Sequence, residues 1–446
     1  MELRRFKDII AFKWGQNAPL AFHSLNMEVA EISQQAFEAM QKTALDKAEV
    51  LNLPPEALTE DLSPAKSLLE WQNSQNTEAK DVSLGNKIKS LTLNVTQICN
   101  LHCTYCAAGG DGTYGEAITK LSVEKTLPQL KYFLEKLSAG DNFHITFLGG
   151  EPLLYPQALV AIHNYVTLFS AGKNIQISYS IITNGTLITE ELLKTLAPLK
   201  AQYTLSFDGP QEVQDLLRPQ KKGGSSFEQT FKGYKLLLEN PNLRGRLLIH
   251  SVFSKQNTDV VKSYKFFAEF GFDAIEFTFD VTEDDSQVSL AFTKSLMEAA
   301  ALAYERGGEQ ELRKITLYDN YFRLLDAQTR NWNYCGSGKT LLSIDAANRV
   351  FTCPLAVSNK SESVGNGVEI SQNQIQELSS NLVELNNCQN CWAKTLCGGG
   401  CMFVHQSTTG NKHKKSISYC ERQRNLIINA LMYYQLSRAE KGPYDV

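Results

Sequence analysis

The stretch SLTLNVTQICNLHCTYC, residues 90–106, joins an alternating apolar run to three closely spaced cysteines. The run SLTLNV (90–95) is typical of a buried β-strand. Cys99, Cys103 and Cys106 follow it with the spacing C-x3-C-x2-C. These thiols fit a zinc ion, a disulfide or a reactive cluster. Three ligands do not saturate a tetrahedral metal site, so the rest of the chain has to decide among the three.

A pattern of strand and then helix repeats from residue 88 to residue 280. Amphipathic helices, for example 122–137 and 259–271, separate the apolar runs. Six such units predict an α/β fold with a parallel sheet that curls into a partial (β/α)6 TIM-like barrel. Chemistry in such barrels lies on loops after the carboxyl ends of strands, so the cysteine loop and the GGEP that follows the second strand fall on the active face. The predicted strands are 90–95, 143–149, 175–182, 203–208, 246–253 and 274–280.

The composition indicates a globular protein with several domains. The 446 residues suffice for about three domains at roughly 150 residues each, and 43% of them are hydrophobic. A net charge of −4 disfavours a nucleic-acid binder. No apolar run reaches transmembrane length, and MELRRFKDII is not followed by the apolar region of a signal peptide. We expect a cytoplasmic protein that binds neither nucleic acid nor membrane.

The cysteines are clustered rather than scattered. In a reducing cytosol, ten cysteines favour metal or catalytic roles over disulfides. Three lie between residues 99 and 106, and none occurs from 107 to 334. The remaining seven crowd the last quarter of the chain, at Cys335, Cys353, Cys388, Cys391, Cys397, Cys401 and Cys420.

Three domains are predicted along the chain. Residues 1–85 combine two or three strands within 4–33 with three helices, two of them around 34–51 and 64–72, which fits a small winged-helix-like module. The polar stretch 72–81 is typical of a linker. Residues 86–310 would hold the barrel, and residues 311–446 the C-terminal cysteines.

The first cysteine triplet, with Tyr105 just before the last cysteine, resembles the signature of the radical S-adenosylmethionine (SAM) enzymes. The resemblance covers roughly residues 88–300. It implies that Cys99, Cys103 and Cys106 hold a 4Fe–4S cluster whose free iron binds SAM, and that an electron from the cluster cleaves SAM to a 5′-deoxyadenosyl radical. Structural zinc, the alternative, needs four closed ligands, and only His102 lies nearby in sequence.

Four further residues, Gly149, Gly150, Glu151 and Pro152, look like the GGEP motif of that family. The resemblance implies that small residues let the backbone approach SAM, and that carbonyl and carboxylate oxygens accept hydrogen bonds from its ammonium group. Taken alone, these residues would fit an ordinary Gly-Pro turn.

Three more residues match family positions within the expected barrel. Ser206 in SFDGP would bond the SAM ribose or carboxylate, and Arg218 would pair with the carboxylate. Asn184 in TNG is another shared element. The simpler alternatives are a solvated surface arginine at Arg218 and a plain turn at Asn184.

The seven C-terminal cysteines resemble the SPASM domain of radical SAM enzymes that modify peptides and proteins, which carries auxiliary 4Fe–4S clusters. A zinc ribbon is the alternative, although seven cysteines fit poorly into closed four-ligand sites. Auxiliary I would keep an open or non-cysteine iron site, able to bind a substrate thiolate. The resemblance assigns Cys335, Cys353 and Cys401 to auxiliary I, and Cys388, Cys391, Cys397 and Cys420 to auxiliary II.

Asn348 stands where the SPASM pattern has glycine. Asn adopts a left-handed backbone more readily than other non-glycine residues. We therefore expect the hairpin before Cys353 to form despite the substitution.

The N-terminal module resembles the precursor-recognition element of ribosomal-peptide (RiPP) maturases, which captures a leader peptide as an added strand. AAGGDGTYG (107–115), with Tyr114, resembles a loop of thioether-forming maturases. Together, the open auxiliary I and the leader-binding module implied by these resemblances predict a ranthipeptide- or sactipeptide-type maturase that joins a cysteine sulfur to a carbon of a precursor peptide. The resemblances also imply a flavodoxin or ferredoxin as the reductant.

Other functions fit parts of the same pattern. A carbon–carbon (cyclophane-type) crosslinking maturase would share this architecture. A sulfatase-maturing, formylglycine-forming oxidase would want an acidic base near the second SPASM cysteine, where this chain has Pro354. A non-enzymatic iron–sulfur electron carrier or zinc scaffold would not cleave SAM.

Overall fold

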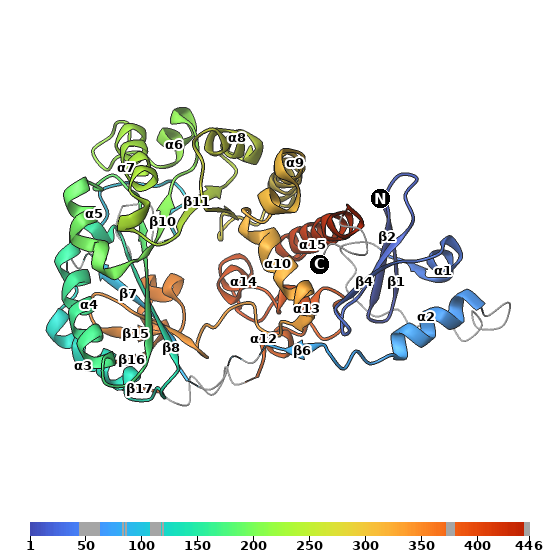
Figure 1. Ribbon diagram of the computed structural model, residues 1–446, viewed down its shortest axis with the longest axis horizontal. Helices are drawn as coiled ribbons and strands as arrows, with labels where there is room; N and C mark the ends of the chain where they lie inside the picture. The colour runs from blue at the N-terminus through green and yellow to red at the C-terminus, as the bar shows by residue number, and fades with distance from the viewer. Residues whose placement is uncertain are drawn as a thin grey trace. The chain divides into compact units, whose positions relative to one another are not determined.

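The computed structural model describes residues 1–43, 63–82, 84, 87–107, 117, 120–371 and 380–440. The chain forms two compact units that interleave along the sequence (Figure 1). We call Leu84–Glu283 with Gly336–Ser379 the central unit, and Met1–Ser83 with Asp284–Cys335 and Ser380–Val446 the terminal unit. The three functional domains expected from the sequence stay a prediction. In the described ranges, no helix has the length and apolar character needed to cross a bilayer.

The central unit is built on one sheet with the strand order β12-β11-β10-β9-β8-β7-β14-β15-β16-β17. Strands β7 to β12 are parallel and follow the sequence order, and each lies within two residues of a predicted strand. Among the described residues β7 and β12 do not pair, so the sheet stays open. The six parallel strands are β7 (Ser90–Thr96), β8 (Asn142–Gly149), β9 (Gln176–Thr183), β10 (Gln202–Ser206), β11 (Leu247–Phe253) and β12 (Ala274–Phe279).

Helices alternate with these strands and lie along the outside of the curved sheet (Figure 1). Helix α3 shows why they form: the Ser122 side chain accepts a hydrogen bond from Lys125 N at its start, and its inner face buries Leu130 and Phe133. Helices α3 and α8 confirm the helices predicted at 122–137 and 259–271. The helices are α3 (Val123–Leu134), α4 (Pro156–Ser170), α5 (Glu190–Leu196), α6 (Gln211–Leu217), α7 (Phe227–Glu239) and α8 (Val260–Phe270).

A C-terminal meander extends this sheet from the strand that precedes the cysteine loop. Its first strand, β14 (Leu341–Ile344), pairs in parallel with β7, and β15 (Arg349–Phe351) returns antiparallel to it. Asn348 has φ 64°, which confirms the prediction of a left-handed residue in a hairpin that still forms. The last two strands are β16 (Ser363–Asn366) and β17 (Glu369–Ile370).

The Asn348 side chain also ties the hairpin to helix α3. Its Nδ2 donates to Thr126 Oγ1 at 2.8 Å and to Gln129 Oε1 at 2.9 Å. Gln129 Nε2 in turn donates to the Asn348 carbonyl at 3.1 Å. A glycine at this position could not make the two side-chain bonds.

The N-terminal sheet of the terminal unit is larger than the sequence suggested. It has five antiparallel strands in the order β4-β3-β2-β1-β5, so the prediction of two or three strands is wrong. Each alternating stretch contains a hidden turn, marked by Lys7 with φ 50° and Met27 with φ 57°. The helix predicted at 34–51 is too long, since it ends at Ala39 and a strand begins at Gln41; residues 44–51 lie outside the described residues. The strands are β1 (Glu2–Phe6), β2 (Ile9–Lys13), β3 (Leu20–His23), β4 (Glu28–Glu31) and β5 (Gln41–Lys42).

Two helices accompany this sheet within the described residues, one between β4 and β5 and one after β5. Phe37 of the first helix is buried against Phe6 and Ile9 of the sheet. The expected linker 72–81 begins at the end of the second helix and ends in β6 (Lys80–Asp81), which pairs with β13 (Thr329–Arg330). The helices of the terminal unit are α1 (Gln34–Ala39), α2 (Ser63–Asn73), α9 (Ser286–Leu312), α10 (Thr316–Asp326), α12 (Leu382–Leu385), α13 (Lys394–Cys397), α14 (Met402–Thr409) and α15 (Ile417–Glu440).

Candidate active site

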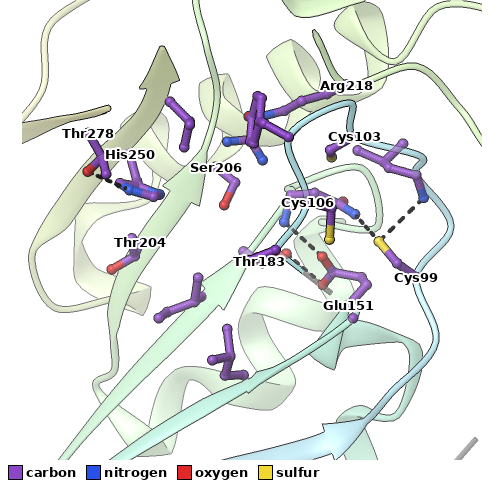
Figure 2. A pocket seen from close by; sticks show the side chains of 18 of the residues that line it. Cys99, Cys103, Cys106, Glu151, Thr183, Thr204, Ser206, Arg218, His250 and Thr278 are labelled. Atoms are coloured by element: carbon purple, nitrogen blue, oxygen red, sulfur yellow. Dashed lines mark hydrogen bonds between the residues drawn. The ribbon is translucent and has the colours of Figure 1, made fainter. Parts of the chain in front are cut away.

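A cavity of about 500 Å³ opens in the central unit at the carboxyl ends of the parallel strands. It collects side chains from every strand from β8 to β12 and from the cysteine loop after β7 (Figure 2). Of the residues expected from the sequence to bind the cluster or SAM, only Pro152 does not line it. Those that do are Cys99, Cys103, Tyr105, Cys106, Gly149, Gly150, Glu151, Asn184, Ser206 and Arg218.

The cysteine loop is held by backbone bonds to the segment after α6. His102 N donates to Pro219 O at 2.8 Å, and Thr104 N donates to Leu217 O at 2.9 Å. Burial raises the pKa of Cys99 to about 11 and that of Cys103 to about 12. Thiols in such surroundings ionise readily only when a metal binds them. Three thiols that line one cavity in this way suit a cluster.

The glycines of GGEP allow the end of β8 to contact the cysteine loop. A Cβ on Gly149 would lie 2.1 Å from Thr96 O, and one on Gly150 would lie 2.3 Å from the Ile98 carbonyl. Gly149 also has φ 145°. The backbone that these glycines approach is therefore that of the loop leading to Cys99, and Gly150 N donates to Thr96 O at 2.9 Å. Pro152 begins the following 3-10 turn, Pro152–Leu154.

The Glu151 carboxylate lies inside the protein and receives three hydrogen bonds. Oε1 accepts from Thr183 Oγ1 at 2.7 Å and from Leu153 N at 3.0 Å, and Oε2 accepts from Asn184 N at 2.7 Å. Burial raises its pKa to about 7, against the effect of these bonds. The carboxylate thus joins the ends of β8 and β9. That Glu151 also receives the SAM ammonium stays a prediction.

Asn184 connects that turn to the cluster loop. Its Oδ1 accepts from Thr186 N at 3.0 Å, which is the turn expected from TNG. Its Nδ2 donates to Asn100 Oδ1 at 2.9 Å and points to Cys99 Sγ at 3.7 Å. The side chain is therefore placed to orient the first cysteine as well as to make a turn.

Arg218 is buried, which excludes the surface arginine considered above. Its Nε and Nη2 donate to the two oxygens of Asp208 at 2.9 and 3.1 Å, and Tyr105 Oη donates to Asp208 Oδ2 at 2.6 Å. Burial by itself would lower the pKa of Arg218, but Asp208 outweighs this and raises it. This triad fixes Tyr105, which lies between Cys103 and Cys106.

Sequence reasoning missed two groups in this cavity. Asp208 is part of the SFDGP segment quoted in the sequence analysis. A carboxylate directly after an apolar strand was the sequence feature that could have identified it. His250 interrupts the apolar strand RLLIHSVF at a position that faces the cavity, and Glu276 lies beside it on β12. A polar residue on the face of an apolar strand that is turned to the cavity is the sequence signal for His250 and for Glu276.

The cysteines expected in auxiliary II meet within the terminal unit. They line a cavity of about 30 Å³ that also contacts three cationic side chains. In the described part of the chain, no three His, Cys, Asp or Glu side chains are spaced to hold a single metal ion. The ligands of an iron–sulfur cluster bind separate irons. The cysteines are Cys388, Cys391, Cys397 and Cys420, and the cations are Lys394, Lys415 and Arg424.

The N-terminal sheet contacts this cysteine loop directly. Arg5 Nη2 donates to Asn390 O at 2.5 Å. Lys394 Nζ bonds Asp8 Oδ1 at 2.7 Å, and Thr395 Oγ1 donates to Ser24 O at 2.8 Å. The cysteines expected in auxiliary I belong to different units: Cys353 is in the central unit, and Cys335 and Cys401 are in the terminal unit.

Comparisons with known proteins point to one enzyme superfamily for part of the chain. Residues 93–267 match the Radical SAM superfamily. The chain is similar to the radical SAM cyclopropyl synthase TigE of Paramaledivibacter caminithermalis, with 22% identity over 96% of this chain and 95% of that protein. It is also similar to the cysteine-type anaerobic sulfatase-maturating enzyme of Clostridium perfringens, with 26% identity over 69% of this chain and 87% of that protein.

Two solved structures share the fold. Native anSMEcpe with bound AdoMet superposes with a TM-score of 0.64 at 21% identity, over 78% of this chain and 99% of that one. Streptococcus suis SuiB bound to precursor peptide SuiA gives 0.52 at 16% identity, over 94% of this chain and 100% of that one. Residues 93–267 of this chain therefore form a domain that matches the Radical SAM superfamily.

Proposed function

We propose that this chain is a radical SAM maturase that abstracts a hydrogen atom from a precursor peptide and installs a crosslink, a thioether between a cysteine sulfur and a carbon. The observation that carries the proposal is the single cavity where Cys99, Cys103 and Cys106 meet the GGEP turn. The similarity to a peptide-type maturase fold over nearly the whole chain supports it.

The three cavity cysteines would hold a 4Fe–4S cluster, and SAM would bind beside it. When bound, this pair supplies a 5′-deoxyadenosyl radical that abstracts hydrogen. The protein contributes a fixed site: Asn184 orients Cys99, and the Asp208–Arg218 pair holds Tyr105 in the loop. Ser206 faces the cavity from the end of β10, where it is available to a polar group of SAM.

The N-terminal sheet would bind the leader of the precursor peptide. Within the described residues β4 ends this sheet and pairs only with β3. At the end of this ladder, Ile32 N donates to Pro19 O on the side of β3. Hydrogen-bonding residues alternate along an antiparallel strand, so the backbone N–H and C=O groups of Val29 and Glu31 point away from β3. An extended peptide can add to such an edge as a further strand.

The C-terminal cysteines would hold two auxiliary clusters with the ligand sets given above. Cys335, Cys353 and Cys401 would leave auxiliary I with an open or non-cysteine iron site for the substrate sulfur. A flavodoxin or ferredoxin would be the electron donor. Three 4Fe–4S clusters amount to about twelve irons per chain.

Carbon–carbon closure is the second candidate function. It is favoured by the similarity to TigE, a cyclopropyl synthase, which extends over 96% of this chain. Sulfatase maturation has less support, because the match to the sulfatase-maturating enzyme covers only 69% of the chain and because Pro354 occupies the position where an acidic base was expected.

Co-expression with each short reading frame beside the gene, followed by mass spectrometry of the peptides, tests the proposal. A loss of two hydrogens per crosslink with cysteines protected from alkylation supports a thioether. The same loss with alkylatable cysteines supports carbon–carbon closure. Unmodified peptides, together with about four irons per chain, would contradict both the maturase and the SPASM assignment.

A further inference from the structure

Four polar side chains line the active-site cavity on the side away from the cysteines. They are Thr204 on β10, His250 on β11, and Glu276 and Thr278 on β12. Figure 2 shows Thr204, His250 and Thr278 across the cavity from the three cysteines, with Ser206 between the two groups. A substrate bound between SAM and these side chains would have His250 on its far side.

One nitrogen of His250 is fixed and the other is open. Nε2 lies 3.0 Å from Thr278 Oγ1, and in the tautomer where Nε2–H donates, Nδ1 carries the lone pair. No hydrogen bond to Nδ1 is present among the described residues. Glu276 is the direct cross-strand neighbour of His250 in the parallel ladder, so a carboxylate lies close to the imidazole.

Both candidate reactions remove two hydrogens from the peptide, and SAM accounts for only one. The deoxyadenosyl radical takes a hydrogen atom from carbon. The second hydrogen leaves as a proton, from the thiol in thioether formation or from carbon in ring closure, and the matching electron passes to a one-electron oxidant of the iron–sulfur class. The new C–S or C–C bond forms as that proton is lost. The cavity must therefore supply a proton acceptor.

Resting on the proposed function, we propose that His250 is the catalytic residue that accepts this proton, at Nδ1, and that Thr278 is a positioning residue that holds its tautomer. The same assignment serves sulfur–carbon and carbon–carbon closure, because both release one proton per bond.

Apart from Glu276, the other carboxylate and guanidinium groups of the cavity make hydrogen bonds within the protein. Both oxygens of Glu151 accept protein hydrogen bonds, and Asp208 is held by Arg218 and Tyr105. Asp280 Oδ1 accepts from Thr282 N. At the position where an acidic base was expected, the cavity is lined by Pro354. These contacts leave His250, with Glu276 beside it, to receive a proton.

The surroundings keep the imidazole neutral and able to accept. Burial lowers the pKa of His250. The charges that face it then act in both directions, since Glu276 and Asp208 raise that pKa and Arg218 lowers it. The net shift is downward, so the ring is unprotonated at pH 7 and becomes protonated only below its ordinary value near 6.5.

The test compares His250→Gln with the matched control His144→Gln. Both histidines lie on strands and are hydrogen-bonded to a hydroxyl on the next strand; for His144, Nδ1 lies 2.8 Å from Ser178 Oγ. His144 does not line the cavity. The substrate is the peptide that wild-type protein modifies in the co-expression experiment. 5′-Deoxyadenosine and crosslinked peptide are measured separately, and circular dichroism and iron content confirm that each variant folds and is loaded.

We expect His250→Gln to form 5′-deoxyadenosine within about threefold of wild type while crosslinked peptide falls about 100-fold or more, the usual contribution of a general base. Wild-type product formation should decline as the pH drops through the His250 pKa, and the residual product of His250→Gln should lack this limb. Thr278→Val, the second variant, should lose less product and likewise keep SAM cleavage. His144→Gln should match wild type.

Product from His250→Gln within about threefold of wild type would overturn the assignment. Loss of 5′-deoxyadenosine together with product would also overturn it, because His250 would then act on SAM. Should His250→Gln fail to fold, wild-type product levels in Thr278→Val would count against the proposal. If wild-type protein modifies no peptide, the proposed function is refuted. If wild type modifies a peptide, the results for the variants test only the role of His250.

Discussion

The buried pair of Asp208 and Arg218 makes the sharpest energetic prediction. Asp208 is fully buried and Arg218 is 5% exposed. Asp208 Oδ1 also accepts from Val252 N at 3.0 Å, so each carboxylate oxygen has at least two donors. Removing one member of a buried ion pair leaves the other charge without compensation, which costs about 3–5 kcal/mol. We expect that loss in the free energy of unfolding for Asp208→Asn and for Arg218→Met.

The double variant should lose much less than the sum of the two single variants. Neither uncompensated charge is present once both partners are replaced, so we expect a coupling energy of about 2–3 kcal/mol. Tyr105→Phe is the matched control, because it removes only one hydrogen bond to the same carboxylate and should cost about 1 kcal/mol.

Far-UV circular dichroism of the metal-free chain in urea is the suitable assay. All four tryptophans, at 14, 71, 332 and 392, belong to the terminal unit, so tryptophan fluorescence would not report on this pair. Additive effects, within about 0.5 kcal/mol, would refute the reasoning. So would a loss in Tyr105→Phe as large as that in Asp208→Asn.

Three other predictions concern the loops and the terminal unit. Gly150→Ala should shift the cysteine loop, lower the iron content and lower the free energy of unfolding by about 1–3 kcal/mol, because its Cβ would lie 2.3 Å from Ile98 O. A Cβ on Gly172 would have nothing within 4 Å, so the control Gly172→Ala should match wild type in iron content and thermal midpoint. Asn348→Gly should lower the free energy of unfolding by about 1–3 kcal/mol, because it leaves the buried side chains of Thr126 and Gln129 without a hydrogen-bond partner. Asn348→Ala should lower it further, because alanine tolerates a φ of 64° less well than glycine. Equal stability of wild type and both variants in urea would contradict this account. Burial raises the pKa of Asp8, but the bond and charge of Lys394, together with Gln72 and His23, outweigh burial and leave it lowered. The carboxylate therefore stabilises the fold above about pH 4, and this stabilisation is lost as the pH falls through the folded pKa. Tryptophan fluorescence in urea should show wild type losing stability below about pH 4 more steeply than Asp8→Asn.

Local patterns accounted for the central unit well. The strands β7 to β12 alternate or run apolar over lengths that only a buried parallel sheet uses, so each could be placed within two residues. The order of these strands followed from the repeat of strand and helix. The left-handed Asn348 was also predictable, because few residue types tolerate that conformation.

Other features depend on contacts between distant segments. Pairing of β14 with β7 joins residues about 250 positions apart, and no periodicity in either strand specifies that partner. The hidden turns were hard to predict because the positive φ falls on Lys7 and Met27 and not on a Gly or Asn, which usually adopt it. Asp208 and His250 were missed because a single polar residue on a strand gains meaning only when the neighbouring strands show what it faces.

The contacts of Arg5 with Asn390 and of Asp8 with Lys394 set an order of events during synthesis. The terminal unit joins the first 83 residues to segments that begin at 284 and 380, so a nascent chain cannot make these contacts until residues 390 and 394 have left the ribosome. The long middle segment of the central unit, Leu84–Glu283, emerges earlier and can begin to collapse first. A chain truncated before residue 390 would release an N-terminal sheet without its partner, and a chain that starts after residue 83 would expose the surface of the cysteine loop that the sheet covers.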